Sequence, residues 1–247
     1  RQVGHYWLRA PELAPAGSAE IERSLAQIHH LAQGPERDVL LIGIGGSALG
    51  PELVVDALAK SPERFHLLDS VDPDGIARTL PLLDPRQCTF LVASKSGSTV
   101  ETRMAPRPPE AHRAQSRQIL SDAAIAITTA CSPLAELGAG WQAVVPVWDW
   151  VGGRTSITSA VGLLPMALMG IDIEAFLGGA RAMDVWTRQS SDNPAAGLAG
   201  AWLSAGQRSW VMLPYADRLR YLGRYLQQLV MESLGKSHTR SGAAIHH

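Results

Sequence analysis

The stretch 38–47, DVLLIGIGGS, joins a continuous apolar run to a glycine-rich loop, and a helix-forming segment over 49–59 follows it. An uninterrupted apolar run is typical of a strand that is buried on both faces of a parallel sheet. A glycine-rich loop between such a strand and a helix lets backbone N–H groups approach an anion, and the positive end of the helix attracts the same charge. This stretch therefore predicts an α/β fold with an anion-binding loop at the carboxyl end of a strand.

The same alternation of strand and helix continues along the first part of the chain. The further apolar runs that we expect to form strands are 65–71, 89–94, 123–129 and 143–149. Helices are expected over 19–31, 49–59, 73–82 and from about residue 99 onward. Strands that alternate with helices predict a doubly wound, mostly parallel sheet flanked by helices, with right-handed crossovers.

The pattern changes after Gly153. Three helices are then expected in succession, over 156–169, 172–189 and 194–204. A strand over 209–215 and a long helix over 217–234 resume the alternation. The parts that we expect are a helical segment over 1–37, a first α/β domain over 38–170, connecting helices over 171–204, and the incomplete start of a second α/β unit over 205–247.

The composition excludes several classes of function. The formal net charge is −1 and no basic stripe with interleaved aromatic residues appears, so we expect neither a nucleic-acid partner nor binding to an anionic membrane surface. No apolar run is long enough to span a membrane, and the first residues do not form a signal peptide. Cys88 and Cys131 show neither metal-ligand nor disulfide spacing, and the histidines show no ligand spacing. We therefore expect reduced thiols in the cytoplasm and no bound metal.

Two further loops repeat the chemistry of the first. The loop 94–99, SKSGST, places four hydroxyls within six residues after an expected strand, and the loop 152–156, GGRTS, adds an arginine to two glycines. Hydroxyls and backbone N–H groups can saturate the oxygens of a terminal phosphate, which suits a phosphate monoester better than a bridged pyrophosphate. Capping of the next helix by Ser98 or Thr99 is the alternative. Three such loops in one domain predict a small phosphorylated ligand.

The first loop also fits another interpretation. Gly43, Gly45 and Ala48 match the relaxed dinucleotide-binding fingerprint, and Asp69 lies near the end of the next expected strand. A nicotinamide-dependent dehydrogenase is therefore an alternative, although it leaves the hydroxyl-rich second loop unexplained.

Arg154, Gln228 and Glu232 are candidates for chemistry on the bound ligand. The guanidinium of Arg154 could stabilise a developing oxyanion, and a salt bridge to Asp149 or to another carboxylate is the alternative. Gln228 and Glu232 are four residues apart and so share a helix face, where apolar neighbours suit a general base. A solvent-facing glutamate is the alternative for Glu232.

Five segments resemble the glucose-6-phosphate isomerase family in its bacterial, cyanobacterial-like form. They are VGHYWLR (3–9), IGIGGSALGP (42–51), SKSGSTVETR (94–103), DWVGGRTSITSAVGLLP (149–165) and YLQQLVMESLGK (225–236). The resemblance implies two sugar-isomerase (SIS) α/β domains, the first over 38–170 and the second opening near residue 205. It also implies that this chain is cut at both ends, because family members continue with histidine-bearing segments.

The resemblance further implies an aldose–ketose isomerase that interconverts glucose 6-phosphate and fructose 6-phosphate through an enediolate. Glu232 would move a proton between C1 and C2, Arg154 would stabilise the intermediate, and Gln228 would position the substrate. The residues implied to bind the sugar phosphate are Gly46, Ser47, Ser94, Lys95, Ser96, Ser98, Thr99 and Gly153. No metal or redox cofactor is implied, and a homodimer is expected because the family's active site borrows residues from a partner. A non-catalytic sugar-phosphate-binding SIS module and an NAD(P)-dependent dehydrogenase are the competing hypotheses.

Overall fold

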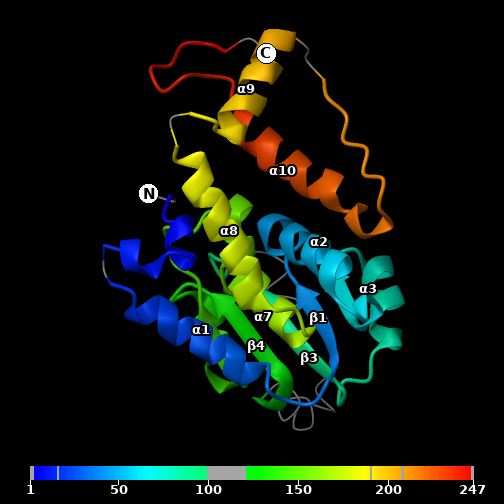
Figure 1. Cartoon of the computed structure of the whole chain (residues 1–247). Coiled ribbons are helices and arrows are strands. Elements are labelled where there is room, and N and C mark those ends of the chain that lie inside the picture. Colours follow the sequence, from blue (N-terminus) through cyan, green and yellow to red (C-terminus); the bar gives the residue numbers. More distant parts are fainter. Residues whose placement is uncertain (1–2, 16, 99–120, 190, 207–208, 246–247) are drawn as a thin grey trace.

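A computed structural model of the chain describes residues 3–15, 17–98, 121–189, 191–206 and 209–245 (Figure 1). These residues form a parallel sheet of five strands in the order β2-β1-β3-β4-β5. The strands are β1 (Asp38–Ile42), β2 (Phe65–Leu68), β3 (Cys88–Ala93), β4 (Ala124–Thr128) and β5 (Ala143–Pro146). The predicted doubly wound parallel sheet is therefore confirmed.

The central strands supply side chains to both faces of the sheet. Leu41 lies in one core with Leu91 and Ile125, whereas Leu40 and Phe90 lie in the core of the opposite face. Successive residues of a strand point to opposite faces, so one uninterrupted apolar run fills both cores.

Helices cover both of these cores. Those that contribute to the first core are α1 (Ala19–Leu31), α2 (Leu49–Leu58), α7 (Ala160–Leu168) and α8 (Ile173–Thr187) (Figure 1). The short helix α6 (Pro133–Leu137) packs into the second core through Leu134. The other α-helices of the described residues are α3 (Pro73–Thr79), α9 (Pro194–Ala205) and α10 (Leu222–Leu234).

The helix expected over 156–169 is confirmed in two pieces. A 3-10 turn over Gly153–Thr158 comes first, and α7 begins at Ala160. The Ser159 hydroxyl caps this helix by accepting a hydrogen bond from the Val161 N–H at 3.3 Å. The helix expected from about residue 99 lies outside the described residues.

The prediction of a strand over 209–215 is wrong. Residues 209–215 form neither strand nor helix, and the side chains of Val211, Leu213 and Tyr215 are 76%, 65% and 98% exposed. Apolar and aromatic residues form a strand only where a neighbouring strand pairs with them. The structure places no described strand beside this segment, so its composition misled the prediction.

The helix expected after this segment is confirmed, as a 3-10 turn over Asp217–Leu219 followed by α10. That 205–247 opens a second α/β unit stays a prediction. No helix among the described residues combines the length and the apolar character needed to cross a membrane.

Candidate functional site

The first two anion loops meet at the topological switch point of the sheet. Strands β1 and β3 are neighbours, while β2 lies on the far side of β1 and β4 lies on the far side of β3. Open α/β sheets bind ligands beyond the carboxyl ends of two such strands. The loop 43–48 follows β1 and the loop 94–98 follows β3, so both loops lie at this edge.

The first and third loops pack backbone against backbone. A Cβ atom added to Gly46 would lie 2.2 Å from the Gly153 carbonyl oxygen, so the first loop accepts only glycine there. The Ser156 hydroxyl holds both loops as a shared donor, 2.8 Å from the Gly46 carbonyl oxygen and 2.7 Å from that of Gly153. The structure thus brings the candidate residues Gly46 and Gly153 into contact, although they are distant in sequence.

The second loop keeps one serine inside and presents two to the surface. Buried Ser94 accepts a hydrogen bond from the Gly97 N–H at 3.1 Å, which shapes the turn. Ser96 and Ser98 are exposed, and their hydroxyl oxygens lie 3.0 Å apart. Ser94 therefore supports the loop, whereas Ser96 and Ser98 can reach a ligand. Thr99 lies outside the described residues.

Gly97 allows this turn for two reasons. Its φ is +66°, in the left-handed region that favours glycine, and an added Cβ would lie 2.7 Å from the Ser132 hydroxyl oxygen. Ser132 is itself fixed, because its hydroxyl lies 2.8 Å from that of Thr128 at the end of β4. The loop conformation is therefore set by the neighbouring strand.

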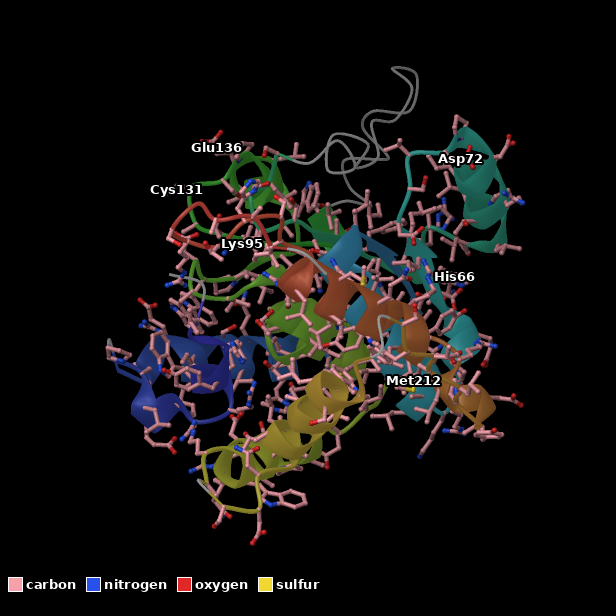
Figure 2. All side chains as sticks on the ribbon, turned by 90° about the horizontal axis from the view of Figure 1, so that it is seen from above. His66, Asp72, Lys95, Cys131, Glu136 and Met212 are labelled. Carbon is pink, nitrogen blue, oxygen red and sulfur yellow. The ribbon has the colours of Figure 1, made fainter. Side chains whose placement is uncertain are left out.

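The Lys95 ammonium ties the second loop to the segment before the third. It donates hydrogen bonds to the Asp149 carbonyl oxygen at 2.8 Å and to the Val151 carbonyl oxygen at 2.9 Å. Burial lowers the pKa of Lys95, and the negative charge of Asp149 partly opposes this. In the view from above, Lys95 lies to one side of α10 and His66 to the other (Figure 2). Lys95 therefore supplies both a positive charge and a tether at the candidate site.

Helix α10 brings the other candidates to the same edge. The Gln228 Nε2 atom lies 3.0 Å from the position that a Cβ would take on Gly45, and it donates to Glu232 Oε2 at 3.3 Å. The Glu232 Oε1 atom lies 3.6 Å from Arg154 Nε. The Arg154 Nη1 atom donates to the Ser233 hydroxyl at 2.7 Å. The candidate base, its cationic partner and the candidate positioning residue therefore lie together beside the loops.

Ser47 occupies the turn between the first loop and α2 and is half-buried. Its N–H donates to the Ile44 carbonyl oxygen at 3.1 Å, which closes the turn that precedes the helix. This position at the start of a helix suits a residue that contacts an anion.

Sequence reasoning missed the serines that hold these groups in place. Ser156, Ser132 and Ser233 contact, respectively, the first loop, the second loop and Arg154. Ser156 lies within the third loop and Ser233 follows Glu232, so both were available as signals. Ser132 could not be found this way, because its role depends on the pairing of β3 with β4.

The acidic residue that the dinucleotide-binding alternative needs is already paired with an arginine. The Asp69 carboxylate, which would bind a ribose hydroxyl, lies 3.3 Å from Arg224 Nη2 of α10. This ion pair uses the carboxylate within the protein. The geometry therefore does not favour a dehydrogenase.

The chemical groups at this edge complement one another. A carboxylate can accept a proton, and a guanidinium can stabilise the negative charge that develops when a proton leaves. Glycine-rich and hydroxyl-bearing loops at the carboxyl edge of a parallel sheet suit a phosphate. Fold and site together are those of an α/β protein suited to proton transfer on a small phosphorylated ligand.

Comparison with known sequences gives the family. The family model of phosphoglucose isomerase matches residues 29–247, and the chain belongs to the phosphoglucose isomerase family. The chain is similar to the glucose-6-phosphate isomerase of Cyanothece sp., with 47% identity over 100% of this chain and 51% of the relative. It is similar to that of Geobacter sp. (strain M21), with 48% identity over 98% of this chain and 51% of the relative. The chain thus spans about half the length of the curated relatives it matches.

Solved structures agree with this assignment. A glucose-6-phosphate isomerase from Chlamydia trachomatis matches 99% of this chain and 51% of its own, with a TM-score of 0.85 and 28% identity. A hypothetical protein from Thermus thermophilus matches 99% of this chain and 58% of its own, with a TM-score of 0.79 and 32% identity. The predicted fold class and the family resemblance are therefore confirmed.

Proposed function

We propose that the protein to which this chain belongs is an aldose–ketose isomerase that interconverts glucose 6-phosphate and fructose 6-phosphate. The observation that carries the proposal is the 3.6 Å approach of Glu232 to Arg154, from two distant elements, beside the three loops. The relatives from Cyanothece and Geobacter are named glucose-6-phosphate isomerase, which supports glucose 6-phosphate as one of the two substrates.

The proposed reaction is a proton transfer between two neighbouring carbons. Glu232 removes the C2 proton of the open-chain aldose, and the electron pair of that bond forms an enediolate with its negative charge on O1. Arg154 stabilises this charge as a fixed cation. The Glu232 carboxyl then returns its proton to C1, and the O2 proton moves to O1 as the ketone forms. Gln228, which contacts Glu232 at 3.3 Å, orients the substrate against the carboxylate.

The proposed phosphate site uses the loops at the carboxyl ends of β1 and β3. Ser47, Ser96, Ser98 and Thr99 contribute hydroxyls, and Lys95 contributes a positive charge. Gly46 and Gly153 let the sugar approach the backbone, and Ser94 holds the second loop in shape. Such an arrangement satisfies the phosphate oxygens with several donors at once.

The assembly and the compartment are part of the same proposal. We expect a homodimer of the whole protein, in the cytoplasm, acting without a metal or redox cofactor. The free thiols of Cys88 and Cys131 suit a reducing compartment.

The test is turnover of fructose 6-phosphate by this chain and by Glu232→Gln. Glucose 6-phosphate is detected with its dehydrogenase, and the reaction in deuterium oxide is followed by NMR. Because the amide of Gln cannot accept the proton, we expect kcat to fall by about 10³-fold or more. Proton transfer through the enzyme predicts deuterium at C2 of the product.

Glu12→Gln is the matched control. The side chains of Glu12 and Glu232 are both 53% exposed, and each pairs with an arginine, Glu12 with Arg181 at 2.7 Å. We expect this control to leave kcat unchanged. A folded chain that binds the sugar phosphate without turnover would instead support a non-catalytic binding module.

A further inference from the structure

Helix α10 lies beside α2 (Figure 1). Arginine–carboxylate contacts join the two helices. Arg220, just before α10, forms an ion pair with Asp56 of α2. Arg224 lies between two carboxylates, with Nη1 3.3 Å from Glu52 Oε2 and Nη2 3.3 Å from Asp69 Oδ2. We name Arg220, Arg224 and these three carboxylates the charge clasp.

The two arginines of the charge clasp and the two candidate site residues of α10 are evenly spaced in the sequence. Arg220, Arg224, Gln228 and Glu232 follow one another at spacings of four residues. Residues four apart on a helix lie on the same face, one turn after another. The face of α10 that contacts α2 therefore carries both the clasp and the catalytic groups.

The two carboxylates on α2 are also four residues apart, and their order along the chain is the reverse of that of the arginines they contact. Arg220 contacts Asp56, Arg224 contacts Glu52, and Gln228 then lies over Gly45 in the first loop. The two helices are thus antiparallel, and their ion pairs lie in register with the site. The position of α10 along α2 decides which part of the first loop Gln228 meets.

Ion pairs fix the register of this helix, whose apolar side chains are only partly buried. Helix α10 contains no buried residue, whereas the Asp56 and Glu52 side chains are only 12% and 14% exposed. Burial raises the pKa of Glu52, and the Arg224 guanidinium opposes that rise. Carboxylates so poorly hydrated require a cation, and only one register of α10 supplies arginines to both.

We propose that Arg220 and Arg224 are positioning residues, which fix α10 along α2 and so place Glu232 against Arg154. The inference rests on the proposed role of Glu232 as the base. A slip by one residue moves a helix by about 1.5 Å along its axis and turns it by about 100°. An error of about 1 Å in a catalytic group can cost about 10²-fold in rate.

The kinetic test compares Arg220→Gln/Arg224→Gln with Arg218→Gln. Arg218 is the matched control, because its guanidinium donates to the Ala57 carbonyl oxygen at 3.2 Å rather than to a carboxylate. We expect the double variant to lose at least about 10-fold in kcat, with KM changed by no more than about twofold, because the phosphate loops are not on α10. An equal loss in Arg218→Gln, or a change in KM alone, would overturn the proposal.

Exchanging the charges of Asp56 and Arg220 distinguishes an effect on the position of α10 from a general loss of stability. Asp56→Arg and Arg220→Asp are each expected to slow kcat, and the combined variant Asp56→Arg/Arg220→Asp is expected to recover most of the loss, because the pair is restored with reversed polarity. A combined variant as slow as the single variants would contradict the clasp.

Measuring the distance between α2 and α10 tests the charge clasp even if the chain shows no enzymatic activity. Nitroxide labels on Leu58→Cys and Met231→Cys, with Cys131→Ser to remove the exposed native thiol, report the position of α10 along α2. These two sites are 52% and 63% exposed. Loss of both arginines should shift or broaden the distance distribution by about 1.5 Å or more.

The two proposals fail in different ways in this experiment. An unchanged distance distribution in the double variant overturns the clasp, whatever the activity. A shifted distribution in the double variant, together with a whole protein that shows no turnover, supports the clasp and contradicts the proposed isomerase activity.

Discussion

Different interactions hold two parts of the candidate site in place. One part is formed by the first and third loops, and the other is helix α10. Gly46 and Gly153 are in backbone contact, and Ser156 links their carbonyl oxygens. Helix α10 has no buried residue, and arginines hold it to α2. Steric packing at backbone distance admits one arrangement, whereas ion pairs near the surface are weaker and more adjustable. Packing therefore fixes the first and third loops, whereas the position of the helix that carries the base depends on its ion pairs.

The largest effect is expected where the first and third loops pack backbone against backbone. Gly46→Ala places a Cβ atom 2.2 Å from the Gly153 carbonyl oxygen, so the two loops must separate. We expect a loss of about 5 kcal/mol or more in the free energy of unfolding, measured in urea, because backbone rather than a side chain must move. Gly153→Ala is the control, because an added Cβ there meets nothing within 4 Å. Equal losses in both variants would refute backbone contact as the cause.

An intermediate effect compares the core with α10. Leu164 of α7 is 0% exposed, and Leu164→Ala should cost about 3–5 kcal/mol in the free energy of unfolding. Leu226 of α10 is half-buried, and Leu226→Ala should cost about 1 kcal/mol. Urea denaturation of both variants measures the difference. If Leu226→Ala proved as costly as Leu164→Ala, apolar packing would hold α10 as firmly as the core.

The smallest effect is expected at alkaline pH. Burial raises the pKa of Tyr225 in α10 above its ordinary value of 10.0. The folded state then holds the phenol proton more tightly than the unfolded state, so this contribution to stability is complete below pH 10 and is lost as pH rises through and beyond it. Its slope cannot exceed about 1.4 kcal/mol per pH unit. Tyr225→Phe removes the titrating group, so its unfolding free energy should fall less steeply above pH 10.

Tyr215→Phe provides the comparison for that experiment, because the Tyr215 side chain is 98% exposed. We expect its unfolding free energy to follow that of the unaltered chain at every pH. Parallel pH curves for Tyr225→Phe and the unaltered chain would contradict a partly buried phenol with a raised pKa at Tyr225.

The sheet could be predicted because its signal is local. The runs that became β1, β3 and β4 are apolar except at Asp38, Thr89 and Thr128, which few structures other than a strand buried on both faces allow. The glycines and serines after β1 and β3 mark the loops directly, since they supply unusual backbone conformations and donors within a few residues. The resemblance, rather than spacing, placed Arg154 beside Glu232.

Long-range contacts could not be predicted in this way. The segment 209–215 has the composition of a strand but pairs with no strand in the part of the chain that the structure describes, and a strand is defined by its partner. The hydrogen bonds of the Lys95 ammonium to two carbonyl oxygens beyond β5 are another contact between segments that are distant in sequence. The pairing of Arg224 with Glu52 and Asp69 likewise depends on which helix lies beside α10.

The contact between Gly46 and Gly153 also has an entropic consequence. The two loops are fixed against each other before any ligand arrives, so binding there orders little additional backbone. A preorganised surface of this kind keeps more of its contact energy as affinity, since little conformational freedom remains to be lost. Thermal motion of the first and third loops should therefore have little effect on ligand affinity. The conformational entropy that binding still costs comes from the side chains of the second loop and from α10.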